Sequence, residues 1–204
     1  MEFGLWLSLL SICLLGAMSP GPSLAVVLRA TLGGGRPAGY AAAISHGVGV
    51  ALYGLLTITG LAVLITRSPS VFFILQLCAA LYLIYLGVNS LRGSAYANPS
   101  EQALGSTRDA AVEGFMVAFL NPKLAVFMLA LFSQFLHSDF GVREKSIMVA
   151  TVGITDALWY ALVTSLLARE SFLAKLRKSA GTIDKVFGLI LIALALSVAV
   201  NALL

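Results

Sequence analysis

Two ionisable side chains lie deep in apolar stretches of this sequence. Lys123 lies in a hydrophobic run over residues 114–136, and Asp156 lies near the centre of a run over residues 146–168. A charge at the centre of a lipid bilayer costs about 2.5–3.5 kcal/mol on insertion scales, so such residues are functional candidates. If the two face each other, they lower that cost and form a pair that a proton or an anion could open. The alternatives are a static ion pair, or a lysine that reaches the membrane surface.

Three polar residues near these charges are further candidates. His46 lies in an apolar run over residues 38–65, where it could carry protons, contact a substrate, or be a neutral histidine satisfied by a neighbouring helix. Asn121 could bond free backbone carbonyls or a substrate carboxylate. Ser23 is interpreted as a small polar residue lining the same site.

A short phrase recurs in the chain and places these residues together. Residues 21–26 (GPSLAV) and 121–126 (NPKLAV) align at an offset of 100 residues (122 − 22). Proline lacks an N–H and clashes with the preceding turn, so Pro22 and Pro122 each break or kink a helix. We interpret the two prolines as equivalent breaks with a polar site between them; plain kinks, which membrane helices tolerate, are the alternative.

The composition identifies the solvent of this chain as lipid. Of its 204 residues, 59% are hydrophobic and 11% are charged, with a mean hydropathy of +0.97, whereas soluble domains are about 45–50% apolar and about 25% charged. The net charge of +4 comes from short loops and forms no basic stripe, which argues against nucleic-acid binding. Cys13 and Cys78 give neither a disulfide framework nor metal-ligand spacing, and we expect no metal and no cofactor.

The apolar runs predict an all-α integral membrane protein with six transmembrane helices, since about 20 apolar residues cross a bilayer. The first and fourth helices are broken at their prolines. Residues 31–37 are interpreted as a flexible turn, and residues 169–185 as a basic amphipathic segment on the membrane surface. The expected helices cover residues 3–28, 38–65, 70–91, 114–136, 146–168 and 186–204.

The six helices form two similar halves within a single membrane domain over residues 1–204. Repeat one covers about residues 1–91, a polar connector about 92–113, and repeat two about 114–204. Gly47 and Ala51 also align with Gly153 and Ala157 at an offset of 106 (153 − 47). Three crossings per half make the repeats inverted, which places a binding site near the midplane at the broken helices. The distribution of Lys and Arg predicts that both termini lie outside the cell.

Six short motifs are spread along the chain: Pro20-Gly21-Pro22, Gly35-Arg36 with Gly39, Tyr85-Leu86-Gly87, Gly114-Phe115, Asn121-Pro122-Lys123 and Gln134-Phe135. With these motifs the chain resembles, over nearly its whole length, the lysine exporter (LysE/RhtB) family of amino-acid efflux proteins. Asp156 before Trp159 resembles the family's acidic residue in the fifth span, whereas Ser133 departs from the usual residue before Gln-Phe. The resemblance implies export of amino acids or close derivatives from the bacterial cytoplasm, driven by an ion gradient across the inner membrane.

We therefore predict a secondary active exporter, not an enzyme, that moves amino acids against protons or another coupling ion in the lipid bilayer. Neutral amino acids are favoured because Asp156 is the only carboxylate well inside an expected span. A homo-oligomer is left open. The alternatives are a passive channel or scaffold, and a membrane hydrolase using Ser23 and Lys123, for which no nucleophile elbow is readable.

Overall fold

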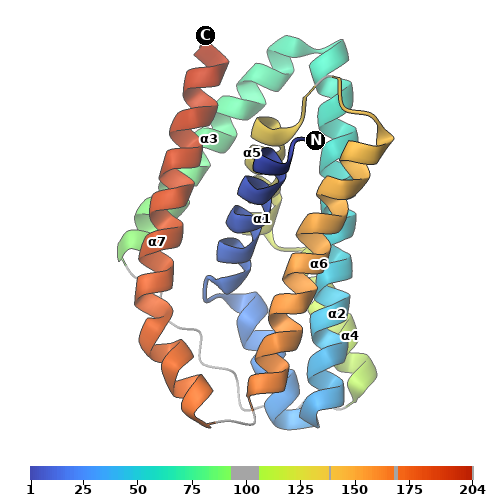
Figure 1. Cartoon of the computed structure of the whole chain (residues 1–204), viewed down its shortest axis with the longest axis vertical. Helices are drawn as coiled ribbons and strands as arrows, with labels where there is room; N and C mark the ends of the chain where they lie inside the picture. The colour runs from blue at the N-terminus through green and yellow to red at the C-terminus, as the bar shows by residue number, and fades with distance from the viewer. Residues whose placement is uncertain (93–105, 138, 168–169, 204) are drawn as a thin grey trace.

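The structure is a computed structural model that describes residues 1–92, 106–137, 139–167 and 170–203. These residues form seven α-helices and no strand, which confirms the all-α prediction for this part of the chain. Large apolar side chains remain exposed on the outside, such as Leu81 at 68%, as lipid contact requires. The helices are α1 Phe3–Met18, α2 Pro22–Arg67, α3 Pro69–Arg92, α4 Thr107–Phe119, α5 Pro122–Phe135, α6 Val142–Leu166 and α7 Glu170–Leu203 (Figure 1).

Four described helices are long and apolar enough to cross a membrane. Their candidate spans are Pro22–Val63, Ser70–Arg92, Val142–Leu166 and Lys178–Val200. Helices α4 and α5 meet at an angle of 54° and together would make a fifth span. Helix α1 has 16 residues, which is shorter than the roughly 20 that a full crossing needs. The chain is therefore a multi-pass membrane protein on its composition and its helix lengths.

The turn expected over residues 31–37 is much shorter than predicted, because α2 is helical on both sides of a single interrupting residue. Gly35 alone leaves the helical region, with φ 74° and ψ −178°. Glycine reaches this conformation because it has no Cβ, so a single residue can redirect the chain. Figure 1 shows the blue start of α2 running to one end of the molecule and its cyan remainder returning from that end.

The fourth and sixth expected helices begin earlier than predicted. Residues 93–105 of the connector lie outside the described part, but Thr107 already begins α4, and the Ser106 hydroxyl caps that helix by accepting from the Asp109 N–H. Residues 178–185 of the expected surface segment lie instead inside the candidate span of α7, which is one helix from Glu170 to Leu203. Its candidate span begins at Lys178 and includes Asp184.

Two glycine pairs hold the helices close to one another. Helix α2 packs against α4 and α6, and α3 packs against α7. A Cβ on Gly47 would lie 2.7 Å from the Gly153 oxygen, and a Cβ on Gly153 would lie 3.0 Å from the Gly47 oxygen. Gly87 and Gly188 meet in the same reciprocal way, at 2.8 and 2.7 Å. Small residues at such crossings let membrane helices approach closely.

The first helix packs against the others with one face, while Phe3, Leu7 and Leu14 remain exposed. Helix α1 packs against α6, α7 and α5, and Leu9 on α1 is fully buried. In Figure 1 α1 starts and α7 ends at the same end of the molecule. Residues at the interruptions between α1 and α2 and between α4 and α5 line one cavity, which is described next.

Candidate functional site

A cavity of about 80 Å³ lies between the two helix interruptions. One water molecule needs about 10–15 Å³ by a comparable measure, so the cavity has room for several waters. Six of the seven residues singled out from the sequence line it: Pro22, Ser23, His46, Asn121, Lys123 and Asp156. The seventh, Pro122, is exposed and does not line the cavity.

The first interruption covers the three residues between Met18 and Pro22. Ser19 precedes a proline and is extended, with φ −61° and ψ 125°, because a residue before proline is kept out of the α region. The Ser19 N–H still bonds the Leu15 oxygen at 3.1 Å, which closes α1. Its hydroxyl donates to Asp184 Oδ1 on α7 at 3.0 Å. The first interruption is thus tied to the last helix.

The second interruption covers Leu120 and Asn121. The Asn121 side-chain oxygen accepts from the Lys123 N–H at 3.0 Å and the Leu124 N–H at 3.3 Å, and Pro122 occupies the first turn of α5. This is the usual start of a helix, with proline where its missing N–H does no harm. Asn121 therefore caps free N–H groups, and not the carbonyls suggested by the sequence. The N-terminus of α5, with its partial positive charge, lies beside the cavity.

Lys123 is half-buried and adds a full positive charge at this helix start. Its ammonium nitrogen lies 5.5 Å from the centre of the Phe187 ring, within the range of a cation–π interaction. None of the ion pairs found among the described residues includes Lys123. The acidic residue whose charge acts on it is Asp184. Lys123 can therefore offer positive charge to a carboxylate that enters the cavity.

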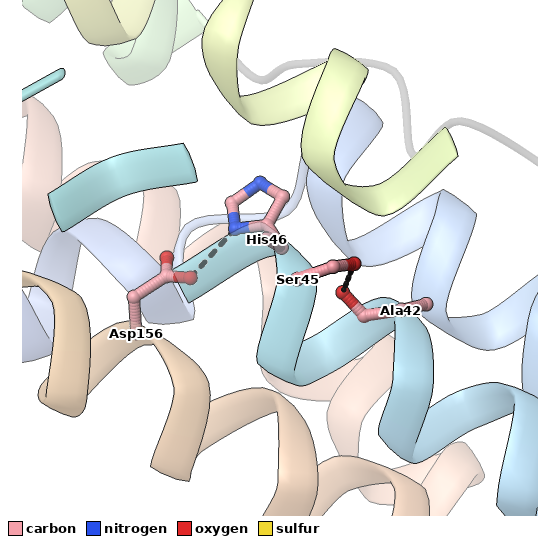
Figure 2. A network of polar contacts seen from close by, with 4 residues as sticks. All are labelled: Ala42, Ser45, His46 and Asp156. Atoms are coloured by element: carbon pink, nitrogen blue, oxygen red, sulfur yellow. Dashed lines mark hydrogen bonds and ion pairs between the residues drawn. The ribbon is translucent and has the colours of Figure 1, made fainter. Parts of the chain in front are cut away.

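Asp156 pairs with His46, and not with Lys123 as the sequence suggested. The Asp156 Oδ2 lies 2.6 Å from His46 Nδ1, and both residues are buried (Figure 2). Figure 2 shows the two side chains pointing toward each other from α6 and α2. The other ring nitrogen, Nε2, is buried and has no hydrogen-bond partner among the described residues. Leaving a buried polar atom unpaired costs about 1–3 kcal/mol, so Nε2 is a position for a transient partner.

Tyr160 completes this side of the cavity one turn after Asp156. Its ring lies edge-on to the His46 ring, with the centroids 5.1 Å apart, and its hydroxyl interacts with Ser23. Tyr160 thus joins the acid–histidine pair to the first interruption. Sequence reasoning missed it, because an aromatic residue in an apolar run looks like ordinary packing.

Asp184 is the other residue that sequence reasoning missed. It is 2% exposed and lies inside the candidate span of α7, so Asp156 is not the only carboxylate within a span. Its basic neighbours Lys178 and Lys185 suggested a surface segment. A signal was available in the spacing, since Asp184, Phe187 and Leu191 repeat at the interval of one buried helix face.

Comparison with known proteins gives the family. A family model described as "LysE type translocator" matches residues 14–202. The leucine efflux protein of Enterobacter sp. (strain 638) is 30% identical over 168 residues, which cover 77% of this chain and 80% of that protein. The threonine efflux protein of Escherichia coli (strain K12) is 23% identical over 169 residues, covering 80% and 82%.

A shorter match reaches an uncharacterized membrane protein of Pseudomonas aeruginosa, 33% identical over 139 residues, which are 65% of this chain and 64% of that protein. No solved structure matches. The family model spans both helix interruptions and all the cavity residues named above. The chain belongs to the LysE-type translocator family.

Proposed function

We propose that this protein is a secondary active exporter of neutral amino acids, driven by the proton gradient across the bacterial inner membrane. The observation that carries the proposal is the charge arrangement of the cavity. Lys123 and the start of α5 supply positive charge at one side, and Asp156 with His46 supplies a carboxylate at another. A zwitterion needs one partner of each sign, and the family relatives include a leucine and a threonine efflux protein.

The rest of the lining favours a neutral side chain. Val50, Phe127, Met128 and Val152 line the cavity with apolar surface. A basic substrate would need a further carboxylate in the lining, whereas the Asp184 side chain lies behind Ser19. Apolar surface beside two charged contacts suits an aliphatic or small hydroxyl side chain, because it gains from burial without leaving a charge unpaired.

The proton step uses the buried acid–histidine pair. With His46 neutral and its Nδ1–H donated to Asp156, Nε2 is a buried acceptor that can take a proton. The positive imidazole then neutralises Asp156 and removes the attraction for the substrate ammonium group. Proton entry from outside would release the amino acid, and proton loss to the cytoplasm would prepare the carboxylate for the next substrate.

The architecture that we propose for this exchange is two inverted repeats with six crossings in one membrane domain. An axis relating the repeats brings equivalent residues into contact with each other. Gly47 and Gly153 already align in the sequence and make reciprocal contacts. Gly87 and Gly188, 101 residues apart (188 − 87), do the same between the third helices of the two halves. These contacts support equivalence of residues 1–91 and 114–204.

The orientation follows from loop charge. Lys and Arg concentrate at the end of the molecule opposite the termini, so the positive-inside rule places both termini outside. A cysteine introduced at Lys178, near one end of the candidate span of α7, should react with a membrane-impermeant thiol reagent only from the cytoplasmic side. Labelling from outside would reverse the orientation.

The function is tested by efflux from proteoliposomes loaded with labelled leucine, threonine or lysine. We expect leucine and threonine efflux to speed up when the outside is made acidic and to fall to the unstimulated rate with a protonophore. The Asp156→Asn protein should lose the response to the gradient, whereas Asp139→Asn, in the exposed loop between α5 and α6, should keep it. Efflux that ignores the gradient would indicate a channel, and no efflux of any amino acid would refute the proposal.

A further inference from the structure

The buried carboxylate of Asp184 is not needed to describe a zwitterion site, yet it lies beside it. Asp184 is 2% exposed, and its Oδ1 accepts the Ser19 hydroxyl at 3.0 Å. Its backbone oxygen accepts the Ser90 hydroxyl from α3 at 2.7 Å, which fixes this part of α7 independently of the carboxylate. The side chain and the backbone of one residue therefore have separate partners.

One turn of α7 contacts both helix interruptions. Asp184 holds Ser19 at the first, and Phe187, three residues later, lies under the Lys123 ammonium at the second. Residues three apart lie on the same face of a helix, so the carboxylate and the ring present one surface to the cavity wall. Ser19 and Phe187 both line the cavity, so this surface lies at its edge.

The charges at this edge would allow one carboxylate to replace another beside Lys123. A buried carboxylate in a membrane helix is costly unless a positive charge balances it. Lys123 is in none of the ion pairs found among the described residues, and the acidic residue whose charge acts on it is Asp184. Two charges that are not in contact attract each other only weakly. A substrate carboxylate that comes closer to Lys123 therefore gains more attraction energy than Asp184 loses.

We propose that Asp184 is the resident counter-ion of Lys123 in the empty cavity and competes with the carboxylate group of the substrate for that lysine. Asp184 is a positioning residue, because it acts on the substrate through Lys123. The proposal rests on the proposed function for the identity of the competitor. It also explains release of the substrate. Once the substrate leaves, Asp184 balances the charge of Lys123 again, so the empty cavity does not carry the free-energy cost of an unbalanced lysine.

The kinetic consequence is specific. Removing the competitor should strengthen binding and slow release, so Asp184→Asn should lower KM and the maximal efflux rate together. We expect each to fall about fivefold, the lower end for two groups that compete through one partner. Asp184→Glu keeps the charge and should recover the maximal rate. Ser90→Ala removes the backbone partner of the same residue and should change neither value; KM rising or staying constant in Asp184→Asn would overturn the proposal.

A second measurement needs no substrate. The thermal unfolding midpoint of the purified protein is compared for Asp184→Asn, Lys123→Met and the double variant, all without amino acid. A counter-ion relation predicts that the double variant is no less stable than the worse single variant, since each single change takes away the opposite charge that the other residue faces. Additive losses would refute it. A wild-type protein that exports no amino acid would refute the proposed function, while this comparison would still decide the role of Asp184.

Discussion

The two helix interruptions share a sequence phrase but differ in how they are built. At the first, three residues separate α1 from α2, and the Ser19 side chain points away from its own segment and donates a hydrogen bond to Asp184 on α7. At the second, Asn121 folds its own side chain over the start of α5, and the next polar group is the Lys123 ammonium. The first interruption is thus held by a residue of another helix, whereas the second is capped by one of its own residues.

The two interruptions share the proline that breaks the helix but differ in charge. Both interruptions come from a proline, which breaks a helix wherever it stands. Only the second carries a charge, and the residues that surround it come from α7. The equivalents of Asp184 and Phe187 at the same offset of 101 as the glycine pair are Leu83 and Leu86, which are apolar. Residues of the repeated sequence phrase line the cavity from two sides, and their unequal side chains make these two sides chemically different.

The largest expected effect is at the charged interruption. Lys123→Ala should lower leucine efflux about tenfold to a hundredfold, because a hydrogen bond to a charged group contributes ~1.5–3 kcal/mol. Ser23→Ala, at the equivalent position of the first interruption, should cost about fivefold at most, since a neutral hydrogen bond contributes ~1 kcal/mol. Initial efflux rates from loaded proteoliposomes measure both. Equal losses would mean that the interruptions are chemically equivalent.

Moving the lysine tests whether position or residue type matters. The double variant Ser23→Lys with Lys123→Ser keeps composition and net charge. We expect no recovery over Lys123→Ser alone, because Phe187 stays beside position 123 and the matching residue of α3, Leu86, has no aromatic ring to offer a lysine at position 23. The same efflux assay decides it. Efflux restored to the wild-type rate would show that the cavity accepts its cation from either side.

The cap of the second interruption should matter less than its charge. Asn121→Ala removes the acceptor of two backbone N–H groups and should cost ~1 kcal/mol of stability, a typical value for a helix cap. That corresponds to a fall of about 2–4 °C in the unfolding midpoint for a chain of this size. Asn121→Ser, also a good capping residue, should restore most of it. A midpoint unchanged in Asn121→Ala would mean that water satisfies the same groups.

The smallest expected effect is at the glycine of the first interruption. A Cβ on Gly21 would meet nothing within 4 Å, and its φ is not positive. Gly21→Ala should therefore shift stability by less than about 0.5 kcal/mol. Gly35→Ala is the contrasting variant, because Gly35 has φ 74° and an L side chain there is strained by about 1–3 kcal/mol. Similar midpoints for the two variants would contradict this account of the turn.

The sequence predicted the interruptions well and the partners poorly. Pro22 and Pro122 give the positions of both breaks, since the effect of proline is local. The cavity residues followed because the repeated phrase and the charged residues inside apolar runs are visible without a structure. The pairing of Asp156 with His46 could not be read, because it depends on how far α6 is rotated and shifted against α2. Asp184 was missed because nearby lysines concealed a buried helix face.

Lipid as the solvent, helices as the only element and two proline breaks one hundred residues apart follow from the amino-acid sequence alone, because hydropathy and proline act over a few residues. The rotation of each helix about its axis does not follow from it. The glycine crossings set that rotation, and with it whether Asp156 meets a lysine or a histidine and whether Asp184 faces lipid or the cavity wall. Charge partners are long-range properties, so only the packed bundle decides them.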